Sequence, residues 1–160
     1  MEYVLVLRWL HIIGATVLLG TGAGIAFFMW MAHRTRDAHF IAATANTVVV
    51  ADIVFTATAV IAQPITGYLL ANAIGWPLTA PWLIASIALY VVTGLAWLPV
   101  VWIQVQLRRQ AHQSARTNTP LMKEYFTLFN YWFACGVPAF ASVLTIVWLM
   151  VAKPSEVWPF

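Results

Sequence analysis

Four long runs of apolar residues, separated by short polar or turn-rich links, dominate the hydrophobic pattern of this chain. The runs cover roughly residues 3–32, 40–70, 82–106 and 123–152. A helix of about 20 residues crosses the roughly 30 Å hydrocarbon layer of a membrane, because each residue adds about 1.5 Å. Each run is therefore predicted to be a transmembrane helix, with the longer ones tilted or extending beyond the membrane. The pattern predicts an all-α fold: one four-helix transmembrane bundle over residues 1–160.

The first run is too long for the apolar region of a cleavable signal peptide. The residues before it, Met1 and Glu2, supply no positively charged side chain, and such peptides begin with a basic region. We therefore expect this segment to be retained as a membrane helix.

The composition agrees with a membrane location and excludes several other classes of protein. Of the 160 residues, 62% are hydrophobic and 8% are charged, whereas about a quarter of the residues in a soluble domain are charged. The mean hydropathy is +0.84. These values exclude a cytosolic enzyme and a disordered chain. The single cysteine, Cys135, excludes an internal disulfide and a paired-cysteine metal site.

The basic residues predict the orientation of the chain. Six of the eight fall at or beside the first and third links: Arg34, Arg36, Arg108, Arg109, Arg116 and Lys123. In a four-span topology both links lie on one side, which the positive-inside rule places in the cytoplasm. Both termini are then outside, in a multi-pass protein of a bacterial inner membrane whose first partner is the lipid bilayer. The basic clusters are short and lack interleaved aromatic residues, so nucleic acid is not an expected partner.

Aromatic residues are predicted to mark both membrane interfaces. On the outer side these are Tyr3, Trp76, Trp82 and Trp158. On the inner side they are Trp30, Trp102, Tyr125 and Trp132.

His11 and Arg8 are the first candidates for function, because ionisable groups inside a span are costly. A neutral imidazole at this depth can ligate haem iron or relay a proton. It can also be a structural group bonded to a carbonyl or to Gln63, which we expect at a similar depth. Arg8 lies three residues before His11 and shares its helix face. It either anchors a carboxylate or extends its charged end to the membrane surface.

Asp52 and Gln63 are the polar residues of the second span. Asp52 is expected either to take part in proton movement or to hydrogen-bond Asn130 and Thr56. It should lie roughly 16 Å deeper than His11, so the two are not expected to touch. Gln63 precedes Pro64, which predicts a kink, and the glutamine side chain can satisfy the backbone carbonyl that proline frees.

Gly20 and Gly24 form a GxxxG pair in the first run. Such a pair favours close helix packing, and the alternative is room for a flat ligand. His33, His39 and His112 fall in basic links, and their spacing is not that of a zinc site, so solvated loop histidines are expected.

Several segments resemble a bacterial family of predicted integral membrane proteins, the domain-of-unknown-function 2269 family. They are Leu10–Gly14, the glycine-rich run ending in Phe27 and Phe28, Gln63–Gly67, Trp97–Gln104 and Trp148–Pro154. The resemblance spans nearly the whole chain and implies an integral membrane fold.

A more distant resemblance links Leu10–Gly14, the later His33, and Phe129-Asn130 ahead of Pro138 to the HemJ-type protoporphyrinogen oxidases. These are small haem-b membrane proteins that oxidise a porphyrinogen. The resemblance implies that His11 is an axial ligand of haem iron and that Arg8 lies near a carboxylate of the haem or substrate. The third run departs from that pattern: Ser86 and Trp97 stand where that family has a lysine and a histidine. A second intramembrane histidine is therefore absent, which leaves the other axial position open.

Three functions follow from these residues. The leading hypothesis is a haem-b oxidoreductase of the porphyrinogen-oxidising kind, with His11 on the iron and Gln63 at the substrate. Gly20 and Gly24 then make room for the cofactor, and Asp52 and Asn130 assist proton release. The alternative is a cofactor-free transporter or assembly subunit, in which Asp52, Gln63 and His11 form a polar path and GxxxG a homodimer seam. The third is a haem electron carrier that passes electrons to a quinone or another respiratory-chain acceptor.

Overall fold

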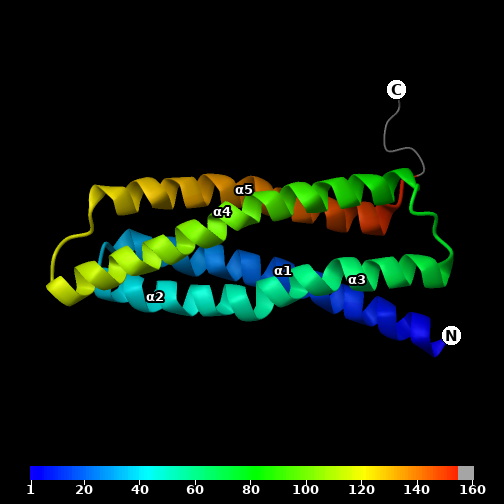
Figure 1. The fold of residues 1–160 in the computed structure, drawn as a ribbon, viewed down its shortest axis with the longest axis horizontal. Helices are drawn as coiled ribbons and strands as arrows, with labels where there is room; N and C mark the ends of the chain where they lie inside the picture. Colours follow the sequence, from blue (N-terminus) through cyan, green and yellow to red (C-terminus); the bar gives the residue numbers. More distant parts are fainter. Residues whose placement is uncertain (155–160) are drawn as a thin grey trace, which may run out of the picture.

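A computed structural model describes residues 1–154, and within them every regular element is helical (Figure 1). The elements are α1 (Glu2–Thr35), α2 (Ala38–Ala51), η1 (Asp52–Thr56), α3 (Ala57–Ile74), α4 (Pro81–Thr117) and α5 (Lys123–Ala152). The segments α2, η1 and α3 form one continuous span, so four helices are long and apolar enough to cross a membrane. The predicted all-α, four-span fold is confirmed.

The two ends of the bundle carry different links (Figure 1). The α1–α2 and α4–α5 links lie together at one end, which we call the basic end because it carries Arg34, Arg36 and Lys123. The start of α1, the α3–α4 link and the end of α5 lie at the other end, which we call the far end. This arrangement agrees with the up-and-down topology that the four runs predict.

Local sequence explains where the helices begin and end. The Asp37 side chain accepts a hydrogen bond from the backbone N–H of His39 and so caps α2. Gly75 ends α3 at φ 82°, a left-handed conformation that glycine adopts without a steric penalty. Pro81 stands in the first turn of α4. That helix continues past Gln106 to Thr117, because its polar end is rich in the helix formers Arg, Gln and Ala.

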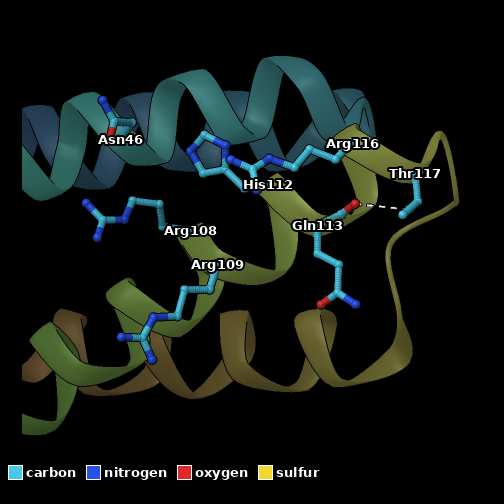
Figure 2. Close-up of a pocket in the computed structure, with 7 residues that line it drawn as sticks. All are labelled: Asn46, Arg108, Arg109, His112, Gln113, Arg116 and Thr117. Carbon is cyan, nitrogen blue, oxygen red and sulfur yellow. Dashed lines mark hydrogen bonds between the residues drawn. The ribbon is translucent and has the colours of Figure 1, made fainter.

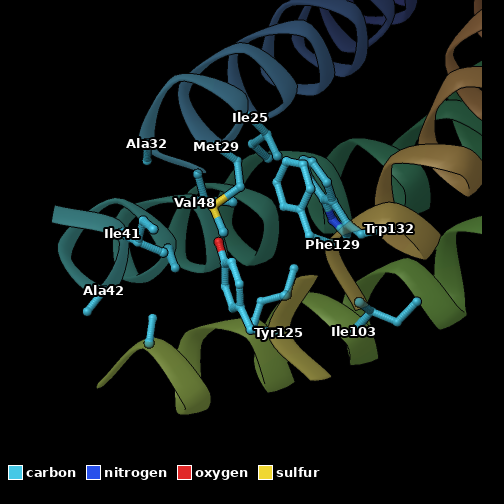
Figure 3. Close-up of a cluster of buried hydrophobic side chains, with 13 residues drawn as sticks. Ile25, Met29, Ala32, Ile41, Ala42, Val48, Ile103, Tyr125, Phe129 and Trp132 are labelled. Carbon is cyan, nitrogen blue, oxygen red and sulfur yellow. The ribbon is translucent and has the colours of Figure 1, made fainter. Parts of the chain in front are cut away.

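A packed core occupies the basic end, where α1, α2, α4 and α5 meet (Figure 3). We call it the basic-end core, and it includes Ile25, Met29, Ala32, Ile41, Ala42, Ala45, Val48, Ile103, Leu107, Ala111, Tyr125, Phe129 and Trp132. Met29, Ile41, Leu107 and Tyr125 have no exposed surface at all. Interlocking large side chains from four segments fix the helices relative to one another here.

His33 belongs to this core and is not the solvated loop histidine that its position suggested. It lies in the last turn of α1, and its ring stacks on Phe129 with centroids 3.6 Å apart and planes 7° apart. The ring of Tyr125 is also stacked with that of His33, with centroids 5.8 Å apart and planes 20° apart. The helix extends further than the apolar run, and this brings His33 under the aromatic side chains of α5.

Three of the aromatic residues predicted for the interfaces are instead buried inside the bundle, namely Trp82, Tyr125 and Trp132. Trp30 and Trp102 remain exposed. Trp158 lies outside the described residues. A tryptophan or tyrosine near a span end can face either lipid or a neighbouring helix, and composition alone does not distinguish the two.

At the far end the helices form two pairs, α1 with α3 and α4 with α5. The pairs meet at the α3–α4 link, where Ala71 packs with Trp82, Leu83 and Leu149. The Lys153 ammonium lies 5.3 Å from the Trp76 ring centre and 5.9 Å from that of Trp82, a favourable cation–π arrangement. We call this group the far-end cluster.

Candidate functional site

A cavity of about 480 Å³ lies between the two helix pairs, in the part of the bundle between the basic-end core and the far-end cluster. Its walls are mostly apolar and come from α1, η1, α3, α4 and α5. The polar side chains that line it are Asp52, Thr56, Gln63, Tyr90, Thr93, Trp97 and Gln104. The volume and the few polar groups on apolar walls are typical of a site for a small molecule or cofactor.

The segment η1 places an acid and a hydroxyl on the cavity wall. Asp52 and Thr56 are 5% and 8% exposed, and both line the cavity. A π-helical turn widens the helix locally, and such turns occur frequently at functional sites. The indole Nε1 of Trp97 donates to Asp52 Oδ1 at 3.4 Å. The Thr56 hydroxyl makes no well-formed hydrogen bond among residues 1–154, and the Asp52 carboxyl one turn earlier is near enough to accept from it.

Pro64 frees the backbone carbonyl of Val60, and the prediction that Gln63 satisfies this group is wrong. The Tyr90 hydroxyl of α4 donates to that carbonyl instead. Because the hydroxyl reaches across from the neighbouring helix, it ties the proline break of α3 to the α4–α5 pair. The Gln63 side chain is thereby available for α1.

Gln63 and His11 lie at one level, as the count of residues along the two spans predicts. The Gln63 amide Nε2 donates to the backbone carbonyl of His11 at 2.8 Å. A Cβ atom at Gly14 would collide with that same amide nitrogen. The glycine therefore provides the room that lets Gln63 approach α1.

The His11 ring is held by a second contact with α3. Its Nδ1 lies 3.0 Å from the Thr66 hydroxyl, and that hydroxyl donates to the Ala62 carbonyl at 2.8 Å. The carbonyls of Ala62 and Gln63 both lie within reach of the single Thr66 hydroxyl proton, and with that proton on a carbonyl, Nδ1 of His11 is the donor of this pair. The lone pair is then on Nε2, for which no hydrogen bond forms within the described part of the chain.

Gly67 completes this arrangement. A Cβ atom at Gly67 would lie 3.0 Å from Cε1 of His11, closer than ordinary contacts allow. The Cε1 edge of the imidazole ring therefore approaches α3 at Gly67, where no side chain intervenes. An anchored Nδ1–H and an unprotonated Nε2 are the pattern found in metal-ligating histidines.

His11 lies at the edge of the cavity and not on its wall. Ala15, four residues along the same face of α1, lines the cavity, and so does Gln63 beside it. Asp52 is eleven residues before Gln63 in the same span, roughly 16 Å along the axis. As predicted, the acid and the imidazole are not in contact.

The remaining predicted site residues lie outside the cavity. Arg8 is exposed, one turn beyond His11 on the same helix. Asn130 is also exposed and does not line the cavity, and the bond that we allowed between it and Asp52 is made by Trp97 instead. A Cβ atom at Gly20 would meet nothing within 4 Å, and at Gly24 it would touch only Phe28 of the same helix. The GxxxG pair is therefore not used for packing between the described helices of this chain.

The sequence analysis did not identify three residues of the cavity wall as site residues: Tyr90, Trp97 and Gln104. The Gln104 carbonyl oxygen accepts from Trp132 Nε1 at 3.1 Å, and both residues are buried. A glutamine in an apolar run was the available signal, since a buried amide requires partners. Tyr90 and Trp97 carry no such signal, because aromatic residues are common in membrane helices.

No group of three or more His, Cys, Asp or Glu side chains within residues 1–154 is arranged to hold a metal ion. A haem iron differs in that its porphyrin supplies the equatorial ligands, so one histidine on the protein is enough. The unpartnered Nε2 of His11 fits this requirement, whereas a metal site made of protein ligands alone does not fit the described residues.

Comparison with curated proteins and with solved structures finds no significant match to this chain. The model of one protein family, described as predicted integral membrane protein (DUF2269), matches residues 5–154. Since that match covers nearly the entire chain, the protein belongs to the domain-of-unknown-function 2269 family of integral membrane proteins.

Proposed function

We propose that this protein is a membrane oxidoreductase that binds haem b through Nε2 of His11. The observation that carries the proposal is the state of this imidazole: Nδ1 is anchored to Thr66 and Nε2 is unpartnered. Haem would supply the one-electron chemistry, and the chain supplies the ligand, the orientation of its ring and an apolar setting. Arg8, on the same helix face, is the side chain that would pair with a carboxylate of the haem or the substrate.

The mostly apolar walls of the cavity favour a substrate that is itself largely apolar, and an oxidoreductase requires one that can give up hydrogen. Oxidising a porphyrinogen removes electrons, which would pass through the haem to a quinone or another respiratory-chain acceptor, and protons, for which a buried acceptor next to the substrate has a chemical purpose. Asp52 is the only carboxyl group on the cavity wall of the described chain, and Gln63 lies between it and His11. A porphyrinogen is the substrate implied by the distant resemblance that we noted from the sequence of Leu10–Gly14.

Absorption spectroscopy of the detergent-purified protein, expressed with ample haem, tests the proposal. We expect a Soret band and, after reduction with dithionite, a b-type α band. His11→Ala should abolish both, while His39→Ala, which alters an exposed histidine at the basic end, should leave them unchanged. A spectrum without these bands in the unaltered protein would contradict haem binding.

The variant Thr66→Val separates two roles: ligation of the haem iron by His11, and positioning of the His11 ring by Thr66. The variant keeps the imidazole but removes the hydroxyl that fixes its tautomer. Haem should still bind, with a shifted reduction potential and weaker retention, because the partner of an axial histidine tunes its basicity. Identical spectra and potentials in Thr66→Val and the unaltered protein would contradict a role for Thr66.

A second function is favoured by the polar groups that line one side of the cavity. Asp52, Thr56 and Gln63 follow one another along the second span, and His11 lies beyond Gln63. In a cofactor-free transporter subunit these residues would carry a proton or polar solute along the helix. The protein would then be colourless, and Asp52→Asn would abolish proton uptake by reconstituted vesicles while His11→Ala would reduce it.

A further inference from the structure

A second pocket, of about 590 Å³, lies at the basic end (Figure 2), and none of the residues that line it lines the cavity. Asn46 of α2 lines it together with the end of α4, namely Arg108, Arg109, His112, Gln113, Arg116 and Thr117. None of these lining residues, all within the described chain, carries a carboxylate. Three guanidinium groups and an imidazole therefore meet in one hollow without an acid among them.

The spacing along α4 explains this concentration of charge. Arg108, His112 and Arg116 follow one another at four-residue intervals, which places them on one face, roughly 6 Å apart. Figure 2 shows these three side chains on the side of α4 toward α2, and α2 packs against α4 along this stretch. Asn46 adds an uncharged amide that can donate to the same ligand.

The position of Arg108 relates the pocket to the membrane surface. It directly follows Leu107, a fully buried residue of the basic-end core, and the polar end of α4 begins with it. Arg116 lies eight residues further, roughly 12 Å along the helix. The pocket thus extends outward from the end of the apolar span through the depth of a lipid headgroup region and beyond it.

We propose that this pocket binds a phosphate-bearing anion. A guanidinium group forks onto phosphate oxygens through two parallel hydrogen bonds, so Arg108 and Arg116, at the two ends of this face, can each bind oxygens of a phosphate-bearing anion. A bound anion also relieves the mutual repulsion of the three guanidinium groups. The anion reaches the pocket either as the headgroup of an anionic phospholipid or as free phosphate, and basic pockets between membrane helices commonly take lipid headgroups. The proposal is independent of the haem site.

Lipid binding by the full-length protein distinguishes the two sources. Purified protein is titrated with phosphatidylglycerol, with phosphatidylcholine and with inorganic phosphate, and bound ligand is counted by native mass spectrometry. The test variants are Arg108→Gln with Arg116→Gln, and Arg108→Lys with Arg116→Lys. The control, Arg34→Gln with Arg36→Gln, removes the same charge from a link at the same end, outside the pocket.

A headgroup site predicts that phosphatidylglycerol affinity falls about tenfold or more in the glutamine pair. It should fall severalfold in the lysine pair, which keeps the charge but loses the fork, and less than twofold in the control. If inorganic phosphate binds and the same variants lose that binding, the site is supported and its ligand is soluble phosphate. The proposal would be overturned if the pocket and control glutamine pairs lost affinity equally while the lysine pair lost none. Binding would then depend only on the overall positive charge of the surface. Because the lysine pair keeps the charge, it gives the answer even if the glutamine pair does not fold.

Discussion

The basic-end core and the cavity region of the bundle differ in what their polar and aromatic residues contact. At the basic end, Tyr125, Phe129 and His33 pack face to face in a core shared by four helical segments. Between that core and the far-end cluster, the helix pairs enclose a cavity, and Asp52 and Thr56 line it. One part of the chain thus holds the helices together, and the other provides room for a ligand. The difference predicts that equivalent substitutions will have unequal effects in the two regions.

Truncating a phenylalanine in each region gives the largest contrast. Phe129→Ala should lower the free energy of unfolding by about 3–5 kcal/mol, because it opens a cavity in a full core and removes the surface on which His33 stacks. Phe140→Ala should cost about 1 kcal/mol, since Phe140 is 36% exposed and already borders the cavity. Chemical unfolding in detergent, followed by circular dichroism, measures both. Similar losses would contradict the division into a packed and an open region.

Glycine-to-alanine substitutions sharpen the comparison at the site itself. In Gly67→Ala the new methyl group would lie 3.0 Å from Cε1 of His11, so the ring must move, at a cost of about 1–3 kcal/mol. Gly94→Ala is the matched control: Gly94 lines the cavity, and a Cβ atom there meets nothing within 4 Å. It should be neutral or stabilising by up to about 1 kcal/mol, because alanine favours helix more than glycine does.

The same pair has a spectroscopic readout if haem is bound at His11. Gly67→Ala should then shift or weaken the Soret band by displacing the imidazole, and Gly94→Ala should not. A Gly67→Ala protein of unchanged stability and unchanged spectrum would show that the close contact with α3 does not hold the ring.

The four spans could be predicted from the sequence because long apolar runs have one stable placement in a bilayer. Depth counting along opposed helices also brought His11 and Gln63 to one level, since each residue adds a fixed rise. Both predictions rest on geometry within a single helix. Neither prediction required knowledge of which helix faces pack against one another.

What the sequence could not supply is the set of contacts between helices. The π-helical turn at Asp52–Thr56, the Trp97–Asp52 bond and the Tyr90 hydroxyl on the Val60 carbonyl each depend on how one helix is rotated toward another. A broadly apolar span has no clear polar face to reveal that rotation. For the same reason Gln63 was assigned to the wrong carbonyl and His33 to solvent.

The smallest expected effect concerns the Thr56 hydroxyl, and it tests whether the polar groups of the cavity serve a ligand. Thr56→Val removes a buried hydroxyl that makes no well-formed hydrogen bond in the described chain, so the free energy of unfolding should stay constant or rise by up to about 1 kcal/mol. Thr93→Val is the control, because the Thr93 hydroxyl lines the same cavity but donates to the Leu89 carbonyl at 2.8 Å. Its loss should cost about 0.5–1 kcal/mol. If Thr56→Val proves the more destabilising of the two, the hydroxyl has a structural partner and the cavity is not held open for a ligand.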